Sequence, residues 1–279
     1  MIALEPFAYG YMTSAIWVSA MIGLVCGLLS AFLILKGWSL IGDALSHAIL
    51  PGVAGAYMLG LPFAFGAFVS GGLAAMAMLF LSARTGLRED AIIGVIFTAF
   101  FGLGLFMVSL NPMSISITTI IMGNVLMIGR SEMVQMAAIS AVVLAVLALK
   151  WRDFMAVFFD PVHARSVGLR VAALRVIFFA LLAAATVAAM QAVGALLVVA
   201  LVITPGASAF LLTARFGRMV LLAGAIGAVS SGLGAYLSYF LDGATGAVIV
   251  LLQSAVFAAA FLFSPRHGIL FRDAPRTGA

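Results

Sequence analysis

The sequence predicts an all-α, polytopic membrane protein that forms one domain over residues 1–279 and crosses the bilayer about nine times (eight to ten). Hydrophobic residues make up 65% of the chain and charged residues only 8%, whereas soluble domains carry roughly a quarter charged residues. Long apolar stretches recur along the whole sequence, and a helix needs about 20 apolar residues to cross the hydrocarbon core. The placement of the basic residues then predicts the orientation of the chain.

The predicted spans lie between charged residues and turn residues. The first begins without a basic segment before it, so we expect it to remain as a span and not to be removed as a signal peptide. Pro51 and Pro205 are each followed by glycine and are expected to interrupt their helices, as in helices that line substrate sites. The predicted spans are 12–35, 39–59, 63–83, 91–110, 131–149, 173–190, 192–213, 219–240 and 244–263.

The lysines and arginines indicate which way the chain is threaded. Such residues stay with cytoplasmic loops, and nine spans place all 14 of them except Arg130 on one side. We therefore predict an N-terminus outside the cell and a cytoplasmic C-terminus. Because this placement accounts for the basic excess, nucleic acid is not an expected partner.

The stretch NPMSISITTIIMGNVLMIGR, residues 111–130, is rich in serine, threonine and asparagine and lies between two clear spans. If it crossed the membrane fully, the two halves of the chain would take opposite orientations and the charge bias would be lost. We therefore expect a re-entrant or surface segment on the outer face.

An aspartate and a histidine lie inside the second predicted span. At a rise of 1.5 Å per residue, Asp43 is about 10 Å and His47 about 16 Å beyond Lys36, which puts His47 near the middle of the bilayer. A carboxylate at this depth costs at least about 2.5 kcal/mol and usually faces a cavity or a partner. The i, i+4 spacing places both side chains on one helix face, where they offer half of a site for a divalent transition metal.

Other roles stay open for this pair. Asp43 is also a candidate helix cap, His47 a candidate partner of a nearby backbone group, and the two together a candidate proton relay. Ser46 is a candidate donor beside them. One helix supplies only two ligands, so a complete metal site needs a second copy of the chain or further groups such as Asn124.

The longest segment expected not to span the membrane lies on the inner side, at residues 150–175. The pattern predicts a short surface helix with Asp160 at the N-cap, Pro161 at the first helical position and Gly168 as the C-terminal stop. An interfacial helix on anionic lipid is one interpretation. The chain has no GxxxxGK[ST] phosphate-binding loop, so we expect no enzymatic activity here and any ATP hydrolysis in a separate chain.

Five long runs of the sequence carry a resemblance that extends, in this order and spacing, along nearly the whole chain. They are KGWSLIGDALSHAILPGVAGAYMLG (36–60), REDAIIGVIFTAFFGLGL (88–105), KWRDFMAVFFDPVHARSVGL (150–169), QAVGALLVVALVITPGASAFLLT (191–213) and DGATGAVIVLLQSAVFAAAFLFSPRHG (242–268). These runs resemble the permease subunits of bacterial ABC importers of the ABC-3 type for manganese, zinc and iron, and most of all the manganese or manganese/iron branch.

The resemblance implies a fold like that of type II ABC importers, in the bacterial cytoplasmic (inner) membrane. It implies Mn2+ as the transported ion, with Fe2+ or Zn2+ as alternatives, and no permanently bound cofactor. The implied partners are two copies of an ATPase subunit, a periplasmic or lipoprotein metal-binding protein and a second permease subunit, the same chain or a paralogue. The implied metal ligands are Asp43 and His47, and the implied ATPase-coupling residues are Asp160, Pro161, Ala164 and Gly168.

Two other transporter classes are the alternatives. A proton-coupled secondary metal transporter would share the intramembrane pair of Asp43 and His47, but such transporters normally have internal repeats, and none is evident in the sequence. A permease of the siderophore or vitamin B12 type passes a large ligand, for which this pair has no clear purpose.

Overall fold

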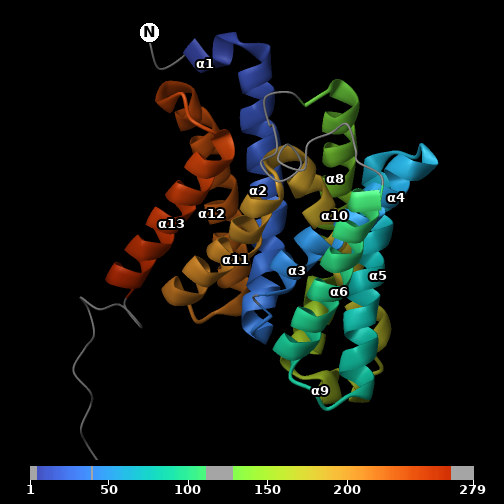
Figure 1. Ribbon diagram of the computed structural model, residues 1–279. Coiled ribbons are helices and arrows are strands. Elements are labelled where there is room, and N and C mark those ends of the chain that lie inside the picture. Colours follow the sequence, from blue (N-terminus) through green and yellow to red (C-terminus); the bar gives the residue numbers. More distant parts are fainter. Residues whose placement is uncertain (1–4, 39, 111–127, 265–279) are drawn as a thin grey trace, which may run out of the picture.

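The computed structural model describes residues 5–38, 40–110 and 128–264. Every regular element in these ranges is a helix (Figure 1), which confirms the predicted all-α class. The predicted outer segment, with Asn124, falls almost entirely at 111–127, outside the described residues. The helices are α1 (Glu5–Ala8), α2 (Gly10–Lys36), α3 (Ile41–Ala48), α4 (Leu50–Leu59), α5 (Phe63–Arg84), α6 (Glu89–Leu110), α8 (Arg130–Phe159), α9 (Pro161–Ser166), α10 (Val171–Val193), α11 (Ala195–Leu212), α12 (Phe216–Leu241) and α13 (Thr245–Phe263).

Within the described residues, seven helices are long and apolar enough to cross a membrane: α2, α5, α6, α8, α10, α12 and α13. They correspond to seven of the nine predicted spans. The predicted span 39–59 is instead a pair of short helices, α3 and α4, and the predicted span 192–213 is the shorter helix α11.

Helix α8 extends beyond its predicted end at residue 149 and stops only at Phe159. The segment 150–175, predicted not to span the membrane, thus begins inside α8 and ends inside α10, which starts at Val171. Lys150 and Asp153 form an ion pair of 3.0 Å on successive turns of α8. Their charges are satisfied along a helix that continues past the apolar region.

The basic ends of the helices gather at one end of the bundle. In Figure 1, the end of α2, the connection between α5 and α6, and α9 all lie toward the bottom, opposite the N-terminus. Arg84, Arg88 and Arg165 belong to these segments. This distribution agrees with the predicted orientation, in which the lower end would face the cytoplasm.

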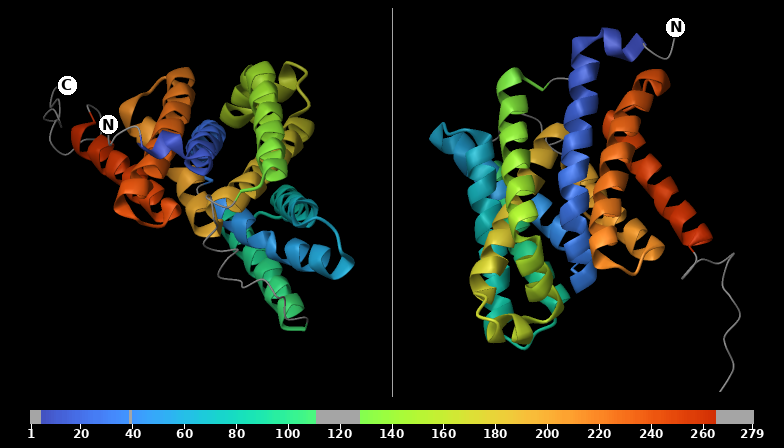
Figure 2. Two further views of the ribbon diagram at one scale, coloured as in Figure 1. Left: turned by 90° about the horizontal axis from the view of Figure 1, so that it is seen from above. Right: turned by 180° about the vertical axis from the view of Figure 1, so that it is seen from behind.

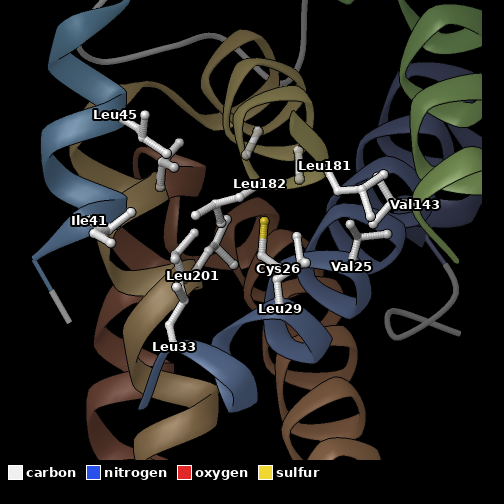
Figure 3. Packing of buried hydrophobic residues seen from close by; sticks show 14 of the residues in the cluster. Val25, Cys26, Leu29, Leu33, Ile41, Leu45, Val143, Leu181, Leu182 and Leu201 are labelled. Carbon is white, nitrogen blue, oxygen red and sulfur yellow. The ribbon is translucent and has the colours of Figure 1, made fainter. Parts of the chain in front are cut away.

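The centre of the bundle is α2, which contacts α12, α11, α8 and α10. Figure 3 shows Cys26 and Leu29 of α2 gathered with Leu182 of α10 and Leu201 of α11 in the buried cluster. The two helices α2 and α12 also lie side by side in both views of Figure 2. In lipid, such contacts depend on close packing, since burial of apolar surface gives no driving force there.

Glycines make the contact between α2 and α12 close enough for backbone to meet backbone. A methyl group built on Gly227 overlaps the carbonyl group of Gly23, and one built on Gly23 overlaps the carbonyl of Gly227. Neither obstacle is a flexible side chain, so the helices would have to move apart. The small residues of these spans are therefore a packing surface.

We expect Gly227→Ala to destabilise the protein by about 1–3 kcal/mol, because an added methyl group in a close-packed contact forces backbone shifts. Gly94→Ala is the matched control, since a methyl group there meets nothing within 4 Å and α6 gains the same helix propensity. Thermal unfolding of the two purified variants in detergent measures the difference. Equal midpoints for both variants would show that the α2–α12 contact tolerates separation.

The two interior prolines behave differently. Pro51 lies in the first turn of α4, directly after the break between α3 and α4, as predicted. Pro205 lies inside α11, which continues to Leu212, so the predicted interruption there was wrong. The Ser30 hydroxyl of α2 donates to the Ile203 carbonyl (3.1 Å) and accepts from the Gly206 N–H (3.0 Å). It thus supplies hydrogen bonds to the backbone around the proline.

Candidate functional site

Asp43 and His47 occupy the one open face of α3. This helix lies between α6 and α11 and also contacts α5 and α10 (Figure 1). Six of its eight residues are buried against these neighbours. The two side chains that are not buried are Asp43, which is 42% exposed, and His47, which is 22% exposed. A polar face left open on an intramembrane helix needs a cavity or another protein surface against it.

The pair is held together by short contacts that also orient the imidazole ring. His47 Nδ1 lies 3.3 Å from Asp43 Oδ1 and 3.1 Å from the Asp43 carbonyl oxygen. Because a carbonyl oxygen only accepts hydrogen bonds, the contact assigns the hydrogen of the neutral ring to Nδ1. In that tautomer the free lone pair of the imidazole is on Nε2.

Two phenylalanines of α6 fix the His47 ring from the side. Phe97 and Phe101 contact it edge-on, with ring centroids 5.4 and 5.5 Å away. They stack on each other at 5.7 Å. The sequence analysis did not find these residues, although their i, i+4 spacing on a predicted span was a usable signal.

Of the other candidates, Ser46 does not join the pair, and Asn124 lies outside the described residues. The Ser46 hydroxyl is buried and donates to the Gly42 carbonyl at 2.7 Å, on the packed side of α3. Across the described ranges, histidine, cysteine, aspartate and glutamate nowhere form a group of three or more with metal-site geometry. Among the described residues, Asp43 and His47 are therefore the two candidate ligand side chains that one chain brings together here.

The short helix α9 has the ends that the sequence predicts. Asp160 is its N-cap, and one carboxylate oxygen accepts the N–H groups of Val162 (2.9 Å) and His163 (3.0 Å). The hydrogen bond from His163, with that from Val162, lowers the pKa of the Asp160 carboxyl below its ordinary value, so the cap is charged at neutral pH. Pro161 is the first helical residue, and Gly168 follows the helix with a left-handed φ of 84°.

One side of α9 is buried against its own chain, and the other side is exposed. Ala164 is fully buried, and α9 contacts α8 and α10 of its own chain. Val162 is 74% exposed and Val167 58% exposed. Ala164 therefore holds α9 on the bundle, whereas the two valines, which the sequence analysis missed, face outward.

A family model and several known proteins match this chain over almost its whole length. The model of the ABC 3 transport family matches residues 8–264. The "Chelated iron transport system membrane protein YfeC" of Yersinia pestis is 58% identical over 267 residues, which are 96% of this chain and 91% of that protein. The "Manganese transport system membrane protein MntB" of Synechocystis sp. is 42% identical over 269 residues, covering 96% and 88%.

A solved structure, "PsaBC from Streptococcus pneumoniae in complex with Fab", has the same fold, with a TM-score of 0.85 at 32% identity. The match covers 96% of this chain and 98% of that chain. Sequence, helix arrangement and full-length coverage thus lead to one conclusion: the chain belongs to the ABC 3 transport family.

Proposed function

We propose that this chain is the permease subunit of an ATP-driven importer of divalent transition-metal ions, with Mn2+ as the main substrate and Fe2+ or Zn2+ as the alternatives. Its family and the iron and manganese transport named for its relatives support this proposal. ATP is hydrolysed by a separate subunit, and a periplasmic or lipoprotein-anchored binding protein delivers the ion from outside.

The observation that carries the proposal is the open face of α3 with Asp43 and His47 on it. Two copies of the chain that meet at this face provide two carboxylates and two imidazoles, a four-ligand set around one ion. The Nδ1–H contact to the Asp43 backbone leaves His47 Nε2 as the metal-binding atom. Backbone carbonyls are common partners of the second ring nitrogen in metal-binding histidines, because they fix the tautomer and the ring orientation.

The donor set suits manganese and iron without excluding zinc. Carboxylate oxygens are hard ligands that Mn2+ accepts, and imidazole suits Fe2+ and Zn2+ as well. At equal geometry the Irving–Williams order predicts tighter binding of Zn2+ than of Mn2+. Selectivity for Mn2+ therefore resides mainly in the delivery protein.

In this proposal, the ATPase subunit docks on α9 and drives transport through that contact. The exposed valines of α9 present an apolar surface of the kind that docks into a groove of a partner subunit. Two ATPase subunits that close on ATP would draw together the α9 helices of the two permease copies. The resulting rocking opens the site between the α3 helices toward the cytoplasm.

The test is metal uptake into proteoliposomes that contain this chain, its ATPase and its binding protein, with radioactive Mn2+ or Zn2+ outside. We expect Mn2+ uptake that requires ATP and does not respond to a proton gradient. Uptake driven by a proton gradient without ATP would contradict the proposal and favour the secondary transporter. Without the binding protein, similar Mn2+ and Zn2+ uptake is expected, and a strict Mn2+ preference would refute the assignment of selectivity to the delivery protein.

A further inference from the structure

Trp38 lies at the junction between α2 and α3, and only 5% of it is exposed. Gly37 ends α2 with a left-handed φ of 73°, and the Trp38 N–H closes the turn on the Leu33 carbonyl at 2.9 Å. The ring is thereby turned inward at the start of α3. The Trp38 carbonyl in turn accepts the Ile41 N–H at the start of α3, the helix that carries Asp43 and His47, at 3.4 Å.

On one side, Trp38 forms a hydrogen bond with α6. Its indole N–H donates to the carboxylate of Glu89, the first residue of that helix. Helix α6 also carries Phe97 and Phe101, whose rings contact His47. The hydrogen bond therefore joins the starts of the two helices that form the candidate metal site.

On the other side, Trp38 packs against the chain that leads to α9. Its ring lies 5.6 Å from that of Phe158 and 5.4 Å from that of Phe179. Phe158 is in the last turn of α8, two residues before the α9 cap Asp160. A continuous series of contacts thus links the end of α8, next to α9, through Phe158 to Trp38 at the start of α3.

A cavity of about 30 Å³ lies beside this contact, lined by Trp38, Ile41, Ser82, Glu89 and Arg175 among others. Its volume suffices for water. Glu89 lies in the positive field of Lys36 and Arg175, which disfavours a cation at this carboxylate. These charges disfavour a second metal ion in the cavity, and the polar contact that Glu89 makes here is the hydrogen bond from Trp38.

We propose that Trp38 is the positioning residue that transmits movement of α9 to the metal helix α3, with its hydrogen bond to Glu89 as the latch between α3 and α6. This inference rests on the proposed transport function. When the ATPase displaces α9, Phe158 shifts the indole, and the latch moves the start of α3 relative to α6. The distance between the His47 ring and its two phenylalanines then changes, so the affinity of the site is coupled to the ATPase cycle.

The test measures Mn2+ uptake and ATP hydrolysis in the same proteoliposomes, and the result is the number of ions transported per ATP. Trp38→Phe keeps an aromatic ring against Phe158 but removes the N–H donor, and Glu89→Leu removes the acceptor. Glu89→Gln keeps a carbonyl oxygen that accepts the bond. The matched controls are Trp151→Phe, at a partly exposed tryptophan of α8, and Asp90→Leu, in the same helical turn as Glu89.

We expect Trp38→Phe and Glu89→Leu each to lower the transport ratio about tenfold, a typical size for a coupling between two sites. Their double variant should be no worse than either, because both remove one interaction. Glu89→Gln and both controls should keep the wild-type ratio. An unchanged ratio in Trp38→Phe, or a proportional loss of uptake, hydrolysis and assembled complex, would overturn the latch. Absence of ATP-dependent uptake in the wild type would instead refute the proposed function itself.

Discussion

Replacing Asp43 or His47 with alanine is expected to lower Mn2+ uptake by about 100-fold or more, because loss of groups that merely orient metal ligands already costs roughly 10–100-fold. In a dimer, each substitution removes two of the four proposed ligands at once. The remaining carboxylates or imidazoles would lie in the membrane without the ion that they share. Uptake into proteoliposomes, with the amount of assembled complex measured beside it, gives the result.

The neighbouring residue provides a matched control for this experiment. Ser46 lies on the same helix, but its hydroxyl is bonded back to Gly42 on the packed side. Ser46→Ala should therefore transport at close to the wild-type rate. Normal uptake by the Asp43 or His47 variants, in fully assembled complexes, would make the pair structural even though the family assignment stands.

Val162→Asp is expected to lower ATP-dependent uptake and co-purification of the ATPase by about tenfold, which corresponds to about 1.4 kcal/mol of binding energy. Val162 is the most exposed apolar residue of α9, and a charge there would be desolvated when the helix enters an apolar groove. Metal binding at Asp43 and His47 should not change. Pull-down of the ATPase subunit and uptake assays measure the two effects.

Val134→Asp is the control for the docking surface. Val134 is 69% exposed and lies in the first turns of α8, at the other end of that helix from α9. The same change of polarity at this distant position should leave ATPase binding intact. If both aspartate variants bound the ATPase like wild type, α9 would not be the docking element and the interfacial-helix interpretation would be favoured.

Local sequence patterns predicted the features that depend on local chemistry. Long apolar stretches predicted the membrane helices, and Asp43 and His47, the only acidic or basic residues inside the second stretch, predicted where the polar face of α3 lies. The caps of α9 followed from Asp160, Pro161 and Gly168, because backbone geometry at helix ends is set by neighbouring residues.

Features that depend on distant residues could not be predicted in this way. Pro205 predicts a break in α11, but Ser30, 176 positions before Gly206, supplies hydrogen bonds that help the helix continue. The charged residues Lys150 and Asp153 favoured an end of the helix near residue 149. In the structure they form an ion pair along α8, which continues to Phe159. Such partners are known only once the helices are packed.

Which side of α9 is buried could not be predicted from the sequence either. A six-residue helix has little periodicity from which to assign faces. Ala164 is buried because α8 and α10 lie against it, and this contact leaves Val162 outside. The resemblance to a family predicted a docking segment, and the packing shows which of its side chains are exposed.

The central claim, that His47 binds the transported ion between two copies of the chain, is tested most directly by pulsed electron paramagnetic resonance. The reconstituted transporter, with isotopically labelled histidine nitrogen in this chain only, is loaded with Mn2+. We predict nitrogen coupling to the Mn2+ spin, with one ion bound per two copies of the chain, and loss of that coupling in His47→Ala. Bound Mn2+ without nitrogen coupling in the wild type, or with unchanged coupling in His47→Ala, would contradict the account.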